Sequence, residues 1–183
     1  MNPYKDKLLA FLDSETSGLR PDEHEILELG LVLYDDSKDE VIKEWSVKIA
    51  PRHIHTAQDQ ALKINGYADD PSLYKANLRT SLIKLNKLVD GCILVGQNIA
   101  FDVAFLERAL SEFNITPSFD RRKLELMSMA WFCVRNKDLN GLSLKDLCNH
   151  FNISNIGAHG ALTDCRRALG VYRSIMAEYK NMR

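Results

Sequence analysis

A run of five apolar residues, Leu8 to Leu12, is followed directly by two acids, Asp13 and Glu15. An unbroken apolar run of this kind is typical of a strand that is buried on both faces. Successive side chains along a strand point to opposite faces, so Asp13 and Glu15 would point to the same one. On its own, the pair also fits an exposed acidic loop after the strand. A buried carboxylate, by contrast, must be paired, hydrogen-bonded or bound to a metal.

The chain as a whole shows the pattern of an α/β domain with a mixed sheet of about five strands. Three strands, at 6–13, 25–34 and 41–49, are expected to form an antiparallel meander with a polar turn at 35–40. A fourth strand is predicted at 92–97. The segments with helical periodicity are 56–65, 71–89, 100–113, 123–136, 143–151 and 161–179.

Length and composition fit one globular domain that spans residues 1–183, with 45% hydrophobic and 27% charged residues. Its apolar runs are far shorter than the roughly 20 residues that cross a bilayer, and its first residues lack the layout of a signal peptide. We therefore expect a cytoplasmic protein with no membrane partner.

The four cysteines form no CxxC pair and are expected to be reduced packing residues. The net charge of −1 gives no overall signal for a polyanion partner, although basic residues cluster locally at 121–123, 166–167 and 180–183.

Two further acids lie on helical segments whose apolar stripes would face the core. Asp102 falls on the stripe that includes Phe105 and Leu106, and Asp164 borders the stripe of the last helix beside Ala161. The helix dipole alone would favour an acid such as Asp102 by well under ~1 kcal/mol. Acids aimed inward from three separate elements instead predict one cluster, which a hard divalent cation such as Mg²⁺ or Mn²⁺ would neutralise.

One histidine, His159, lies between Gly157 and Gly160 and precedes Asp164 by five residues. On one continuous helix that spacing would put His159 and Asp164 on different faces. The glycines therefore predict a loop that lets His159 swing over the acid cluster. A neutral imidazole near pH 7 can accept a proton from water. The other interpretation of a lone histidine of this kind is a surface loop residue.

Three segments resemble the motifs of the DnaQ-like 3′–5′ exonucleases, the family of the proofreading epsilon subunit of bacterial DNA polymerase III. FLDSETSGL at 11–19 resembles the first motif, DxExTGL, and VGQNIAFDVAFL at 95–106 resembles the second. HGALTD at 159–164 resembles the third motif, HxAxxD, which marks the histidine (DEDDh) branch. ALKINGY at 61–67 is similar to the short VHGI-like segment of the family. These motifs, in this order, cover nearly the whole chain.

The resemblance implies a ribonuclease H-like fold and hydrolysis assisted by two Mg²⁺ or Mn²⁺ ions. Asp13, Glu15 and Asp164 would hold the metals, Asp102 would be the remaining ligand, and His159 would be the general base. Nucleoside 5′-monophosphates would leave from the 3′ end. The residues implied to cradle the terminal nucleotides are Thr16, Ser17, Gly18, Leu19, Ile64, Asn65, Asn98 and Phe101.

Some positions depart from the family pattern and leave the substrate open. Gln97 stands where the family often has histidine, and Tyr67 replaces a usual aliphatic residue. We expect a 3′–5′ exonuclease that acts on single-stranded DNA in proofreading or repair, with an exoribonuclease or oligoribonuclease as the alternative. The expected partner is nucleic acid with a single-stranded 3′ end. Two settings stay open, a stand-alone monomer or dimer and an association with a DNA polymerase subunit.

A nucleic-acid-binding module with a dead site is the alternative from a different class. The complete set of the five motif residues disfavours it, because a dead site has no chemical need for all of them. These residues are Asp13, Glu15, Asp102, His159 and Asp164.

Overall fold

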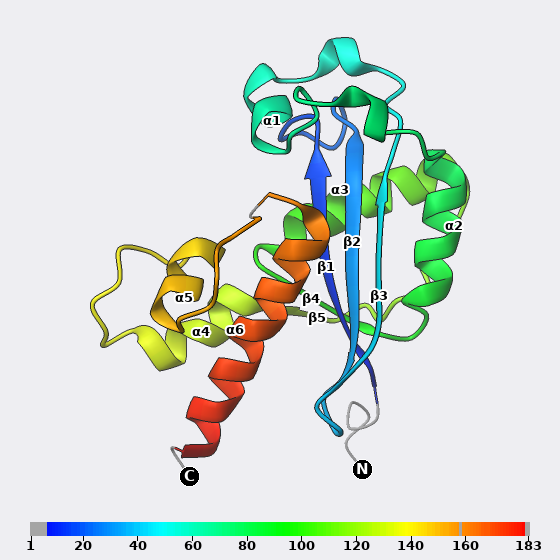
Figure 1. Cartoon of the computed structure of the whole chain (residues 1–183). Helices are drawn as coiled ribbons and strands as arrows, with labels where there is room; N and C mark the ends of the chain where they lie inside the picture. The colour runs from blue at the N-terminus through cyan, green and yellow to red at the C-terminus, as the bar shows by residue number, and fades with distance from the viewer. Residues whose placement is uncertain (1–6, 158, 182–183) are drawn as a thin grey trace.

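The computed structural model of the chain describes residues 7–157 and 159–181, and its centre is a five-stranded mixed sheet (Figure 1). The strand order is β3-β2-β1-β4-β5. β1, β2 and β3 pair antiparallel, whereas β4 and β5 run parallel to β1. The predicted α/β class, mixed sheet and antiparallel meander are therefore confirmed. The strands are β1 (Leu9–Thr16), β2 (Ile26–Asp35), β3 (Glu40–Lys48), β4 (Ile93–Gly96) and β5 (Lys123–Glu125).

β1 continues through both of its acids instead of ending before them. Asp13 is paired with Gly30 of β2, and Glu15 is paired with Glu28, so the antiparallel ladder extends beyond the apolar run. The interpretation of the two acids as part of an exposed loop is therefore wrong. The strand predicted at 6–13 ends later than expected because β2 continues to pair with it, and its predicted first residue lies outside the described residues.

The segment 123–136 is predicted as one helix, and this prediction is wrong for its first three residues. Lys123–Glu125 form β5, which pairs with β4, and helix α4 (Leu126–Val134) follows it. Three residues are too few to show the alternation of a strand, so the pairing with β4 decides their conformation. The Glu125 carboxylate then accepts a hydrogen bond from the backbone amide of Met127 and caps α4.

Side chains cap the N-termini of several helices. The helix predicted at 71–89 begins only at Leu78, because the Asn77 side chain accepts a hydrogen bond from the backbone amide of Thr80. Within the described ranges, no helix combines the length and the apolar character needed to cross a membrane. The helices are α1 (Asp59–Ile64), α2 (Leu78–Leu88), α3 (Ile99–Glu112), α4 (Leu126–Val134), α5 (Leu144–His150) and α6 (Ala161–Asn181), with 3₁₀ turns at Ile54–Thr56 and Pro71–Leu73.

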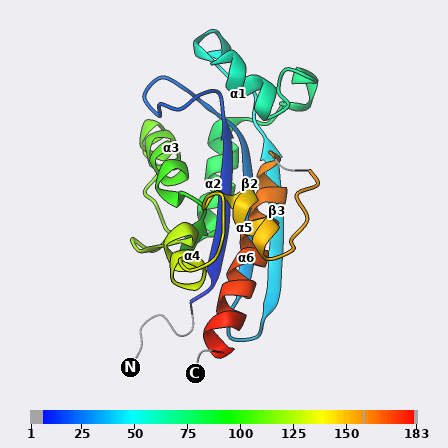
Figure 2. The same ribbon diagram turned by 90° about the vertical axis from the view of Figure 1, so that its left-hand side faces the viewer.

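The helices cover both faces of the sheet, and the two cores alternate along β1. Ala10 and Leu12 belong to the core under α2 and α3, whereas Leu9 and Phe11 belong to the core under α4, α5 and α6. Figure 2 shows α2 and α3 on one side of β1 and β2, with α6 on the other. The four cysteines are free and three are buried in these cores, as predicted. The two acids of β1 follow at odd-numbered positions and therefore face α6.

The N-terminus of α6 lies directly on β2. A Cβ atom at Gly30 would be 2.3 Å from the carbonyl carbon of Ala161 and 2.5 Å from the amide nitrogen of Leu162, so only glycine fits there. The Glu28 carboxylate, two residues earlier on the same face, interacts with the backbone amide of Ala161. These contacts fix where α6 begins, and they place Asp164 in its first turn beside β1.

Gly30→Ala is expected to lower the free energy of unfolding by about 1–3 kcal/mol, because the added methyl group meets backbone atoms that cannot move aside. Gly170→Ala is the matched control. Its Cβ would lie 3.1 Å from the flexible end of the Ile153 side chain. Alanine is also favoured over glycine inside a helix by roughly 0.5–1 kcal/mol. Chemical denaturation measures the difference, and a Gly30→Ala protein as stable as the wild type would contradict the close approach.

Candidate active site

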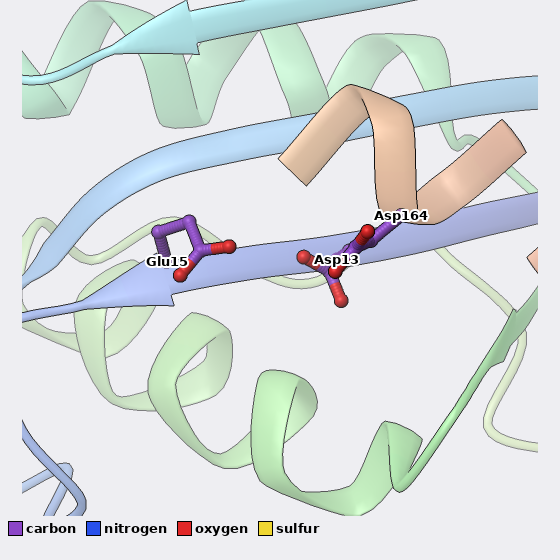
Figure 3. A group of neighbouring side chains, drawn as sticks. All are labelled: Asp13, Glu15 and Asp164. Atoms are coloured by element: carbon purple, nitrogen blue, oxygen red, sulfur yellow. The ribbon is translucent and has the colours of Figure 1, made fainter. Parts of the chain in front are cut away.

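Three carboxylates from two elements meet on the α6 side of the sheet. Asp13 and Glu15 extend from β1, and Asp164 extends from the first turn of α6. One oxygen of each lies within 4.8 Å of the others. Figure 3 shows Asp13 and Asp164 pointing toward each other, with Glu15 farther along the strand. Of the four acids predicted to hold metal, the structure thus brings three to one point.

Burial and mutual repulsion raise the pKa values of these acids. For Asp13 the largest cause is burial, followed by the charge of Asp102, and its pKa lies well above the usual 3.8. Burial likewise raises the pKa of Glu15 from 4.5 to about 8, with the charge of Asp164 as the next cause. A cation bound beside these carboxylates would favour their ionised forms and so lower their pKa values. Three oxygens at this spacing suit a hard divalent ion such as Mg²⁺ or Mn²⁺.

Asp102 lies beside this cluster but is held by a different neighbour. It is 5% exposed in the first turn of α3, and its Oδ1 accepts hydrogen bonds from the Ser14 amide at 2.8 Å and the Ser14 hydroxyl at 2.7 Å. Burial raises the pKa of Asp102 to about 7, although the bonds from Ser14 act in the opposite direction. All four predicted acids therefore interact electrostatically, while Asp102 stays outside the group of converging oxygens.

His159 lies in the loop before α6 and outside the acid cluster. Its side chain is exposed, and its backbone is left-handed with a φ of 69°, like that of Gly157 with a φ of 74°. Residues other than glycine seldom adopt this conformation, and such strain is concentrated at functional sites. The loop agrees with the expectation from the flanking glycines, and the role of His159 as a base stays a prediction.

A cavity of about 310 Å³ opens beside Glu15. Two apolar side chains in its lining, Leu19 and Ile64, are 70% and 48% exposed. Exposed apolar side chains next to a cavity can pack against the flat faces of bases, which every base presents whatever the sequence. The predicted nucleotide-binding residues that line this cavity are Thr16, Gly18, Leu19, Ile64, Asn65 and Phe101.

The other two predicted nucleotide-binding residues, Ser17 and Asn98, do not line the cavity. Ser17 is fully buried, and its hydroxyl accepts a hydrogen bond from the Glu25 amide at 2.8 Å. Asn98 is exposed just before α3 and has a left-handed backbone with a φ of 56°. Asn65 does line the cavity, but its buried side-chain amide donates to the Thr16 carbonyl at 3.0 Å. Ser17 and Asn65 therefore hold the cavity walls in place.

Several residues of the site were not predicted from the sequence. Glu28 is 6% exposed on β2 next to the acids of β1, and the Nζ of Lys48 lies 3.8 Å from its carboxylate. Glu28 could have been identified from the sequence, because it is a charged residue inside an otherwise apolar strand. Gln58 and Gln60 line the cavity, and no motif marks them. Arg167, predicted only as part of a basic cluster, is buried and paired with an acid of the site.

The raised pKa values predict how the stability of the metal-free protein depends on pH. Glu15 and Asp102 have folded-state pKa values of about 8 and about 7, above their usual 4.5 and 3.8. Between these values the folded chain binds more protons than the unfolded chain. In chelator, the free energy of unfolding is therefore expected to fall as the pH rises from about 5 to about 8. Added Mn²⁺ should reverse this loss.

Thermal melts in chelator across this pH range measure the effect, with Asp102→Asn as the comparison. Removal of this carboxylate should raise the metal-free melting temperature near the upper end of the range and flatten the pH dependence. A wild-type protein that instead becomes more stable as the pH rises would contradict the shared burial of the acids.

Comparison with known proteins assigns the family. The family model described as Exonuclease matches residues 10–172, a range that includes all five motif residues predicted to carry catalysis. DNA polymerase III subunit epsilon of Treponema pallidum is 26% identical over 167 residues, which cover 91% of this chain and 75% of the relative. The protein of the same name from Rickettsia prowazekii is 29% identical over 170 residues, which cover 88% and 70%.

Solved structures share the fold. E. coli exonuclease I in complex with a dT13 oligonucleotide has a TM-score of 0.78 at 18% identity, over 94% of this chain and 41% of that chain. A product-bound structure of exonuclease I has the same TM-score at 16% identity, and this chain covers 44% of it. The chain thus spans less than half of exonuclease I, and the likeness confirms the ribonuclease H-like fold. As the resemblance to the DnaQ-like 3′–5′ exonucleases predicted, the chain belongs to the exonuclease family.

Proposed function

We propose that this exonuclease removes nucleoside 5′-monophosphates from the 3′ end of single-stranded DNA. The observation that carries the proposal is the meeting of Asp13, Glu15 and Asp164 next to an open cavity of about 310 Å³. Hydrolysis of a phosphodiester requires an activated water and compensation of the charge on the leaving 3′ oxygen. The acid cluster suits a cation that supplies both, and the cavity beside it has room for a terminal nucleotide.

The proposed ligands of two divalent ions, Mg²⁺ or Mn²⁺, are Asp13, Glu15 and Asp164, with Asp102 completing the set. Bound there, such ions lower the pKa of water and stabilise developing negative charge. The chain orients the ligands in advance, because β1 holds its two acids on a paired ladder and α6 adds the third. Asp102 is kept in place by its two hydrogen bonds from Ser14. This rigidity means that little reorganisation is needed during the reaction.

His159 is the proposed general base. A neutral imidazole can take a proton from the attacking water near pH 7. Its loop leads directly into the turn of α6 that carries Asp164, so the imidazole can approach a substrate held at the cluster. Its solvent-exposed side chain is free to turn toward a bound substrate.

We propose DNA as the substrate on the basis of the names of the relatives and the oligonucleotide bound in a similar structure. Two relatives are named DNA polymerase III subunit epsilon, and one structure of exonuclease I holds a dT13 oligonucleotide. RNA carries an additional 2′-hydroxyl, which a site can accept or reject by its packing. The same names support a DNA polymerase as protein partner and the cytoplasm as location. We further propose that residues 1–183 act as one exonuclease domain.

Digestion of 5′-labelled single-stranded oligonucleotides with Mg²⁺ or Mn²⁺ tests direction and substrate together. A site that reads the 3′-hydroxyl end should give a ladder that shortens from that end, and a 3′-phosphate should slow it. Single-stranded DNA should be degraded faster than RNA of the same sequence, and Asp13→Asn should abolish the ladder.

Three other results would overturn parts of this proposal. Immediate release of labelled mononucleotide from the 5′ end would reverse the direction. Faster digestion of RNA would make the protein an exoribonuclease. Binding of DNA without cleavage in the presence of either metal would indicate a binding module with a dead site.

His159→Ala is expected to lower kcat by about 10²–10⁴-fold, as loss of a general base does. Its Mn²⁺ affinity should stay close to that of the wild type, because the side chain lies outside the acid cluster. His150→Ala is the control, since His150 ends α5 and does not line the cavity. Single-turnover rates and Mn²⁺ titration separate the two effects. Near-full activity of His159→Ala would remove this residue from the mechanism.

A further inference from the structure

Arg167 is a buried arginine beside the acid cluster. It lies one turn after Asp164 on α6, and its side chain is only 6% exposed. Its Nη1 is 2.6 Å from Oδ1 of Asp164, and its Nη2 donates a hydrogen bond to the side chain of Asn155. Arginines are almost never fully buried unless they are paired. The position of this guanidinium is therefore tied to a proposed metal ligand.

The neighbouring arginine shows that surface charge does not explain this placement. Arg166 is 54% exposed, and its Nε lies 3.0 Å from the Glu44 carboxylate on β3. The side chain of Arg167, one residue later, is buried in the protein instead. Its Nε has no hydrogen-bond partner in the part of the chain that the structure describes, although the Cys148 thiol interacts with the guanidinium. The contacts with Asp164 and Asn155 offset that burial.

The guanidinium acts on the cluster in two opposite ways. Its positive charge, 2.6 Å from Asp164, offsets part of the repulsion that this carboxylate has with Asp13 and Glu15. A divalent ion bound among the three carboxylates would also lie close to this charge, because their oxygens are within 4.8 Å of one another. Like charges repel strongly in a site shielded from water. Arg167 thus stabilises the metal-free site and opposes the entry of a cation.

We propose that Arg167 is a built-in counter-cation for Asp164 that sets the metal concentration at which the site fills. This inference rests on the proposed function, because it concerns the same metal site. Arg167 is a positioning residue, since it reaches the reacting atoms only through Asp164. Its bond to Asn155 keeps the guanidinium from turning outward to water when a metal binds. The metal must therefore share this carboxylate with a fixed positive charge.

Calorimetric titration of the full chain with Mn²⁺ tests the proposal in two neutral variants, Arg167→Met and Arg167→Gln. Glutamine retains hydrogen-bond donors without the charge. Both variants should bind Mn²⁺ at least about 10-fold more tightly than the wild type, because a like charge has been removed. In chelator both should melt at a lower temperature, because the repulsion among the acids is no longer offset.

Two further variants separate the charge of Arg167 from its packing. Arg167→Lys restores the positive charge and should keep the Mn²⁺ affinity within about threefold of the wild type. Arg166→Met is the matched control and should bind Mn²⁺ as the wild type does, because its partner Glu44 lies outside the cluster.

Wild-type or weaker Mn²⁺ affinity in the neutral variants would overturn the proposal and leave Arg167 with a structural role alone. If Arg167→Met fails to fold, Arg167→Gln decides the question.

Asp13→Asn identifies a failure of the metal site itself. If this variant binds Mn²⁺ as the wild type does, the acid cluster is not the metal site, and both this inference and the proposed function fall.

Discussion

The close approach of α6 to β2 is the contact on which the site depends. Because Gly30 has no side chain, the backbone of Ala161 can occupy the space that a Cβ atom at position 30 would need. Glu28 interacts with the amide of that same residue, so the first turn of the helix is fixed at two points on one strand. With α6 placed in this way, Asp164 meets Asp13 of β1 (Figure 3). Backbone packing between segments far apart in the sequence therefore assembles the cluster, rather than any local motif alone.

The same packing creates an electrostatic burden for the folded chain. Burial raises the pKa of Asp13 and Glu15 because their charged forms are held away from water and close to one another. Positive charges stand nearby, Lys48 next to Glu28 and Arg167 next to the acid of α6. Buried acids that lie close to one another reduce the stability of the fold, and proteins keep them where the chemistry requires them. The site is thus balanced between internal cations of the protein and the divalent ions that we propose as cofactors.

Local sequence patterns predicted the first strand and the direction in which the acids of the site point. The apolar run and its alternation placed β1 and the direction of its two acids, and helical spacing placed Asp102 and Asp164 toward the core. Features that depend on tertiary pairing were not predictable. The three residues of β5 form a strand only because β4 pairs with them. The bonds from Ser14 to Asp102 and the burial of Arg167 arise between segments that no sequence period connects.

We propose that the three converging carboxylates form one metal site, and anomalous diffraction from crystals grown with Mn²⁺ would locate the ion. We expect an anomalous peak between the carboxylates of Asp13, Glu15 and Asp164 that disappears in Asp13→Asn. A saturating concentration of Mn²⁺ that leaves no peak there, or a peak only at another place on the protein, would contradict it.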